Sequence, residues 1–218
     1  MMTSSDVMAR ASQELGFTNE ILSVRWSYLI EQKGPAQANL IRCVLAAYQM
    51  THSWQLLSSA AETAHQHGSS ILAGYLREHA DEESLHFTWA LDDYAQTVQF
   101  LGENRTIICA PAPCIVRMID RQYGFVRKAA RLSSFMGYVL ALEGFPARPG
   151  TWEAWCEKNG LALSLVQSPI RHSVADQDHR IELFEHISEK VGIDEAATFL
   201  EARACLTDIA RALDPAAY

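Results

Sequence analysis

The 218-residue sequence lacks the features of several large functional classes. It has no basic run interleaved with aromatic residues, and its formal net charge is −8, so nucleic acid is not the expected partner. No apolar stretch reaches the roughly 20 residues that a membrane span needs. The polar N-terminal segment also lacks the apolar core of a signal peptide. We therefore expect a cytoplasmic protein that acts neither on nucleic acid nor at a membrane.

Cysteine is scarce, and its spacing carries no metal or redox signature. The five cysteines are scattered, and none belongs to a Cys-x-x-Cys motif, which argues against a zinc knuckle or a thioredoxin-type redox pair. Reduced and mostly buried thiols are the expected state.

Glycine and proline are also sparse, and they lie between long periodic segments, which is typical of helices joined by short loops. No alternating apolar and polar run is bounded by hairpin turns, so no strand is predicted. We predict an all-α, single-domain bundle of about seven helices, the first of them interrupted near Gly16. The expected helices span about residues 5–32, 35–66, 69–101, 114–143, 151–158, 161–191 and 194–213.

One pattern of metal-binding residue types, His-x-x-x-(Glu/Asp)-x-x-His, occurs twice in the chain. On a continuous helix, positions i, i+4 and i+7 fall within an arc of roughly 60°, so each copy forms one polar stripe. Two facing stripes would offer four imidazoles and two carboxylates, a mixed set suited to iron or another first-row metal. The two copies are His79, Glu83 and His86, and then His172, Asp176 and His179.

Both stripes interrupt apolar helix faces, and a carboxylate buried between imidazoles is costly unless it is paired or binds a metal. A third contribution is expected from Glu143, a lone carboxylate at the end of an apolar helix, which could bridge two ions. Glu83 is preferred over Glu82 because its spacing matches that of Asp176. A solvated acidic face is the alternative; it would account for Glu82, Asp92 and Asp93 but not for the apolar neighbours. These neighbours are Leu72, Leu76 and Trp89 in the first copy and Ile170, Val174, Leu183 and Ile187 in the second.

Three segments together resemble the haem-oxygenase-like di-iron oxidases, also described as iron-containing redox enzymes. The segments are HADEESLHFTWALDD (79–93), GYVLALEG (137–144) and HSVADQDH (172–179). The resemblance implies a haem-oxygenase-like bundle over residues 1–218, without haem, that uses two Fe ions and O2 as co-substrate. The family's ligands would correspond to Glu83, His86, Glu143, His172, Asp176 and His179.

The sequence departs from this family at one ligand position. Several members have a further carboxylate on the preceding helix or about one turn before Glu83. Here the preceding helix offers Gln49 and His52, and the position one turn earlier is His79. His79 is therefore either a ligand in place of that carboxylate or a group that contacts the ligands.

Members of the family oxidise small molecules, and for this chain the resemblance implies N-oxygenation, oxidative C–C cleavage or nitrile formation on an amino acid or derivative. An external reductant and a homodimer are compatible with this interpretation. Candidate substrate-binding residues are Trp89 and Tyr138 on aromatic stripes, and Arg127 and Arg131 as carboxylate clamps. A packed core and a solvated face are the plainer explanations of these two pairs.

Three alternatives remain open. A fatty-acid oxidative decarboxylase of the same family would need a long apolar tunnel without an inward arginine. A metal-free, thiaminase-like enzyme would need a nucleophilic cysteine, for which Cys43 and Cys205 are the candidates, although neither has an adjacent base in the sequence. A non-catalytic helical interaction protein would need neither copy of the repeated pattern.

Overall fold

A computed structural model describes residues 3–102, 110–188 and 193–218 of the chain. It is all-α, with no strand in these ranges, as predicted. The helices are α1 (Ser4–Lys33), α2 (Pro35–Gln66), α3 (Ser70–Glu83), α4 (His86–Leu101), α5 (Pro113–Val126), α6 (Leu132–Glu143), α7 (Thr151–Asn159), α8 (Gln167–Ser188) and α9 (Glu195–Ala212), with short 3-10 turns η1 (Ala129–Arg131), η2 (Leu163–Leu165) and η3 (Pro215–Ala217).

Two expected helices are each divided, which raises the seven helices expected to the nine found in the described ranges. The helix expected over 69–101 breaks between α3 and α4, where the Ser84 hydroxyl donates to the Asp81 carbonyl at 2.8 Å. The helix expected over 114–143 breaks between α5 and α6 at η1. Neither break contains a proline, the residue that most strongly interrupts a helix, so neither could be predicted from the sequence.

The N-terminal helix is longer and more regular than predicted. A capping box between Thr3 and Asp6 opens α1, because each residue's side chain accepts a hydrogen bond from the other's backbone amide. Gly34, at φ 80°, ends α1, and Pro35 then occupies the first turn of α2, where its missing N–H costs nothing. The break expected near Gly16 is wrong, because α1 continues through it.

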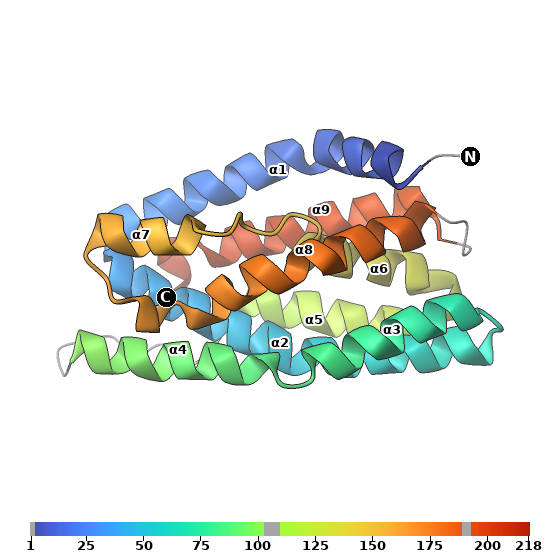
Figure 1. Cartoon of the computed structure of the whole chain (residues 1–218), viewed down its shortest axis with the longest axis horizontal. Helices are drawn as coiled ribbons and strands as arrows, with labels where there is room; N and C mark the ends of the chain where they lie inside the picture. Colours follow the sequence, from blue (N-terminus) through green and yellow to red (C-terminus); the bar gives the residue numbers. More distant parts are fainter. Residues whose placement is uncertain (1–2, 103–109, 189–192) are drawn as a thin grey trace.

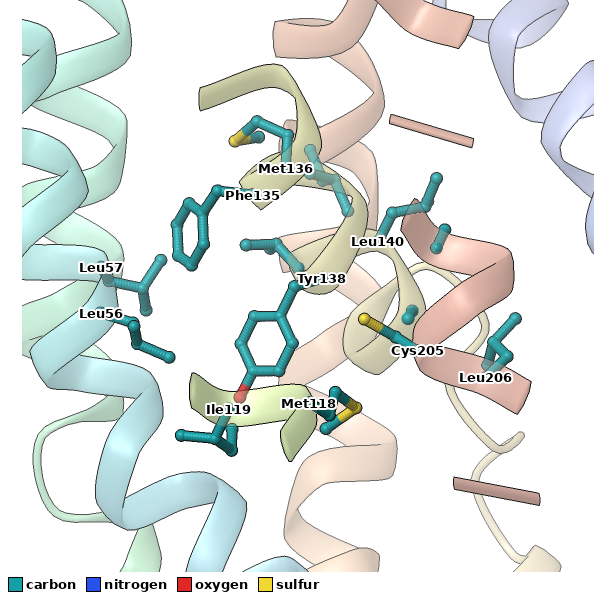
Figure 2. Packing of buried hydrophobic residues seen from close by; sticks show 14 of the residues in the cluster. Leu56, Leu57, Met118, Ile119, Phe135, Met136, Tyr138, Leu140, Cys205 and Leu206 are labelled. Atoms are coloured by element: carbon teal, nitrogen blue, oxygen red, sulfur yellow. The ribbon is translucent and has the colours of Figure 1, made fainter. Parts of the chain in front are cut away.

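The helices pack in two groups that meet at the core. Helices α3 and α4 follow one another along α2, whereas α6 packs against α9, and α8 crosses the middle of the bundle obliquely (Figure 1). Gly137 lets α6 approach α9 closely, since a Cβ at this position would lie 2.3 Å from the Thr198 carbonyl oxygen. Figure 2 shows Phe135 of α6 facing Leu56 and Leu57 of α2. This packing holds the C-terminal end of α6, where Glu143 lies, inside the bundle.

Candidate metal centre

Together with Glu143, the residues of the two repeated patterns converge in the interior from four helices. His79 and Glu83 lie on α3, His86 opens α4, and Glu143 is the last residue of α6. The second copy lies wholly on α8, which continues through Pro169 in its first turn, so its three residues share one face as predicted. The buried members are His79, Glu83, His86, Asp176 and His179, while His172 and Glu143 are partly buried.

The first cluster, which we call centre A, consists of Glu83, His86 and His172. One potential ligand atom from each residue lies within 4.8 Å of the others. The Nδ1 atom of His86 is 2.7 Å from Glu83 Oε1, and the rings of His86 and His172 are 4.9 Å apart. His86 is the first residue of α4, so the break after α3 sets the direction of its imidazole. The arc of roughly 60° that was expected for His79, Glu83 and His86 on one continuous helix therefore does not apply to His86.

The second cluster, centre B, consists of His79, Glu82 and His179, again with ligand atoms within 4.8 Å of one another. Glu82 Oε2 lies 3.0 Å from His179 Nε2, although the Glu82 side chain is 58% exposed. Glu83 is the more buried of the two, as preferred, and the structure also brings the more exposed Glu82 to a second cluster.

Two further carboxylates lie beside these centres. Glu143 Oε1 is 2.8 Å from His79 Nε2, and its other oxygen is 3.8 Å from His179 Nδ1. Asp176 Oδ1 is 3.9 Å from the same His179 nitrogen. Glu143 and Asp176 thus contribute further oxygen atoms close to the imidazole ligands of centre B.

Whether these residues suit a metal ion can be judged from the hydrogen bonding of their buried polar atoms. Within the described residues, four buried atoms of this group have no hydrogen-bond partner, a concentration that a folded protein does not normally tolerate. Bound cations would satisfy them, and the nitrogen and oxygen donors suit iron and neighbouring first-row metals. The four atoms are His79 Nδ1, Glu143 Oε2, Asp176 Oδ1 and His179 Nδ1, whereas His86 Nδ1 has Glu83 Oε1 at 2.7 Å.

The shifted pKa values of Asp176 and His79 are also consistent with a cation site. Burial raises the pKa of Asp176 to about 8, and the nearby carboxylates of Glu143 and Glu83 add to the rise. Burial alone would lower the pKa of His79, but the charge and hydrogen bond of Glu143 outweigh it and raise the pKa to about 9. Without metal, the site therefore holds protons at these two residues to offset its negative charge, a role that cations can take over.

His172 and Glu83 differ from these two residues, because their pKa values are lowered. Burial lowers the pKa of His172, so its imidazole is neutral near pH 7. His172 Nδ1 lies 2.9 Å from the Ser168 carbonyl, which fixes the proton on Nδ1 and leaves the Nε2 lone pair free to bind a metal. Burial would raise the pKa of Glu83, but its contact with His86 dominates and lowers it, which favours the carboxylate form.

A cavity of about 340 Å³ opens beside centre A. Its lining joins residues of the candidate metal centre to a polar region on α2 and at the start of α8. Its volume suits a small organic ligand. The lining residues are Arg42, Ala46, Gln49, Met50, Ser53, Glu83, Leu142, Glu143, Trp152, Ser168, Pro169, His172 and Asp176.

The candidate substrate residues from the sequence lie elsewhere. Trp89 stacks on His86, with ring centroids 4.0 Å apart, but it is not part of the cavity lining. Tyr138 is buried and pairs with the Ser53 hydroxyl at 2.8 Å, so it packs behind the lining. Arg127 and Arg131 are exposed and do not line the cavity. The solvated explanation therefore fits both arginines.

Sequence reasoning missed two charged residues near the cavity, Asp93, which is buried, and Arg42, which is partly buried. The solvated-face alternative would have accounted for Asp93, but Asp93 is 1% exposed, so that alternative does not hold for this residue. Its carboxylate pairs with Arg42 at 2.9 Å and accepts hydrogen bonds from the backbone amides of Gln167 and Ser168. The available signal was Arg42 itself, a lone charge inside the apolar run ANLIRCVLAA. Conversely, Val174 was expected to be core but is 61% exposed.

The two candidate nucleophilic cysteines are poorly suited to that role. Cys43 and Cys205 are both fully buried, and burial raises the pKa of each thiol. Reactive cysteines instead have a lowered pKa and some access to solvent. This environment disfavours the thiaminase-like alternative.

Comparison with known proteins supports the fold and does not extend to function. No protein family model matches the chain, and no curated protein matches it. A crystal structure from Shewanella denitrificans, described as a domain of unknown function with a heme oxygenase-like fold, is similar over 91% of this chain and 90% of its own, with 18% identity and a TM-score of 0.52. The chain thus has a haem-oxygenase-like fold with buried clusters of residues that can hold metal ions.

No described helix combines the length and the hydrophobicity that a membrane span requires.

Proposed function

We propose that this protein is a non-haem di-iron oxidase that uses O2 to oxidise a small molecule, namely an amino acid or a derivative of one. The observation that carries the proposal is the pair of neighbouring clusters, centres A and B, with Glu143 and Asp176 beside them. A site for one structural metal would need only a single closed set of ligands. Bound Fe(II) would supply the electrons and the reactivity toward O2 that no amino-acid side chain provides.

The chain's own residues would hold and shield this chemistry. Centre A would hold one ion and centre B the other, while the cavity beside centre A receives the substrate. The protons held at His79 and Asp176 in the metal-free protein would leave as the ions bind. The apolar part of the lining, including Leu142 and Trp152, would limit the access of water to the reacting group.

The cavity favours an amino-acid-like substrate over a fatty acid. The fatty-acid alternative called for a long apolar tunnel without an inward arginine, whereas Arg42 lines the compact cavity found here. The products considered are those of N-oxygenation, oxidative C–C cleavage or nitrile formation.

The test is anaerobic Fe(II) titration followed by exposure to O2 with a panel of amino acids and fatty acids. We expect two Fe(II) per chain and O2 uptake that depends on one class of substrate. Iron binding below one ion per chain, or O2 uptake that no compound in the panel changes, contradicts the proposal.

A further inference from the structure

Two chemically different groups of residues line the cavity beside centre A. Glu83, Glu143 and Asp176 contribute carboxylates. The polar region on α2 and at the start of α8 contributes Arg42, Gln49 and Ser168. This region contains hydrogen-bond donors and a cation that the proposed metal chemistry does not use.

Arg42 is held rigidly. Its Nε donates to Asn39 Oδ1 at 2.9 Å, and its Nη2 donates to Asp93 Oδ2 at 2.9 Å. Its guanidinium also lies over the Trp152 ring, 5.4 Å from the centroid. The side chain is only 13% exposed, yet among the described residues its Nη1 has no hydrogen-bond acceptor. A fixed guanidinium with a free donor edge is suited to binding an anion.

Asp93 does not neutralise this region, because its carboxylate is shared. Its two oxygens accept hydrogen bonds at 2.8 and 3.0 Å from the amides of Gln167 and Ser168, the first two residues of α8. One carboxylate therefore faces both a guanidinium and the positive end of a 22-residue helix. The single negative charge of Asp93 is thus set against the full positive charge of Arg42 and the partial positive charge of the helix end.

Two further donors lack partners within the described part of the chain. Ser168 is fully buried and its hydroxyl makes no hydrogen bond, and the Gln49 side-chain nitrogen is likewise buried without an acceptor. Both residues line the cavity with Arg42. Unpaired buried donors are costly, and a ligand that accepts hydrogen bonds would remove that cost.

We propose that Arg42, Gln49 and Ser168 bind the carboxylate of a small-molecule substrate and thereby orient the rest of it toward centre A. The proposal rests on the function proposed above and narrows its substrate to a monocarboxylate small enough for a cavity of about 340 Å³. The role of carboxylate clamp that the sequence suggested for Arg127 and Arg131 thus falls to Arg42.

The test compares three probes that differ only in their charged groups: L-leucine, 4-methylpentanoate, which lacks the amine, and L-leucinamide, which lacks the carboxylate. Calorimetric titration is carried out on the metal-free protein and on the anaerobic Fe(II) protein. We expect both carboxylates to bind the metal-free protein and the amide to bind at least about tenfold more weakly, as befits a charge-assisted contact. Equal binding of the amide, or no binding of either carboxylate, overturns the proposal.

Variants assign the effect to this region. Arg42→Gln should weaken 4-methylpentanoate binding by about tenfold or more, and Arg42→Lys, which keeps the charge but loses the planar fork, should lie between it and the wild type. Arg117→Gln removes the same charge from the exposed surface of α5 and should leave binding unchanged. Wild-type affinity in Arg42→Gln contradicts the assignment.

Arg42→Gln also leaves Asp93 without its cationic partner and could therefore disturb the fold. A second variant separates the loss of binding from such a disturbance. Gln49→Glu keeps the Arg42–Asp93 pair and adds a negative charge to the lining, so it should repel carboxylates while the circular dichroism spectrum stays native. The iron titration separates the two proposals. Two Fe(II) per chain without carboxylate binding refutes only the substrate inference, whereas carboxylate binding without iron refutes only the oxidase.

Discussion

At the scale of single residues, Glu82 and Glu83 show how one helix end can serve two sites. They are adjacent in sequence, but one lies 3.0 Å from His179 in centre B and the other 2.7 Å from His86 in centre A. Successive helical positions are rotated by about 100°, so adjacent side chains diverge. Glu82 and Glu83 can therefore reach two different centres, because both centres lie near the end of α3.

This arrangement yields a matched pair of variants. Glu82→Gln should lower Fe(II) binding from two ions to one per chain by weakening centre B, and Glu83→Gln should do the same through centre A, because a neutral amide is a poorer ligand than a carboxylate. The measurement is anaerobic iron stoichiometry. Glu78→Gln, an exposed change on the same helix, is the control and should retain both ions. Two tightly bound ions in Glu82→Gln would show that Glu82 is not a ligand.

The buried Asp176 predicts an unusual dependence of stability on pH. Its pKa in the folded protein is raised from 3.8 to about 8, so between these values the folded state holds a proton that the unfolded state has lost. Stability of the metal-free protein should therefore fall as pH rises from about 4 to about 8. His79, raised from 6.5 to about 9, acts in the same direction at higher pH.

Urea unfolding of the metal-free protein at several pH values measures this slope. Asp176→Asn removes the titrating group, so the variant should lose less stability than the wild type between pH 5 and 8. A wild-type slope that Asp176→Asn leaves unchanged would show that the carboxyl does not titrate in this range.

At the scale of helices, the sequence predicted α8 well and α3–α4 poorly, for physical reasons. Pro169 falls in the first turn of α8, where proline is tolerated, so periodicity alone was a sufficient guide to its polar face. Ser84 and Leu85 interrupt the other helix without glycine or proline, and local sequence did not reveal the break. The positions of Arg42 and Asp93 depend on contacts between α2, α4 and α8, which periodicity cannot supply.

Alanine substitutions at two helical glycines should change the stability of the protein in opposite directions. Gly137→Ala would place a methyl group 2.3 Å from the backbone oxygen of Thr198, so α6 and α9 must separate, at a cost of about 1–3 kcal/mol. Gly16→Ala meets nothing within 4 Å inside the continuous α1 and should stabilise the protein by about 0.5–1 kcal/mol. Chemical denaturation of both variants checks the predicted difference in sign, and a stable Gly137→Ala would contradict the close approach.

At the scale of the whole molecule, the candidate ligands come from α3, α4, α6 and α8, so bound metal would link segments from residue 79 to residue 179. The unfolded chain cannot present such a set of ligands, and metal binding therefore adds directly to folding stability. This coupling would account for the unpaired polar atoms in the interior if the two centres bind metal ions. The free-energy cost of these unpaired atoms in the metal-free protein would be offset by the binding of the ions.

We accordingly expect anaerobic Fe(II) to raise the melting temperature, because a ligand at a hundred times its dissociation constant contributes about 2.7 kcal/mol per site. Glu82→Gln and Glu83→Gln should each show a smaller rise than the wild type, and the double variant should show almost none. The control is Mg²⁺ at the same concentration, which prefers oxygen ligands and should have little effect at a site rich in imidazole. An equal rise with Mg²⁺, or a full rise in the double variant, would mean that the stabilising ion binds elsewhere. The histidines and carboxylates gathered here would then need another explanation.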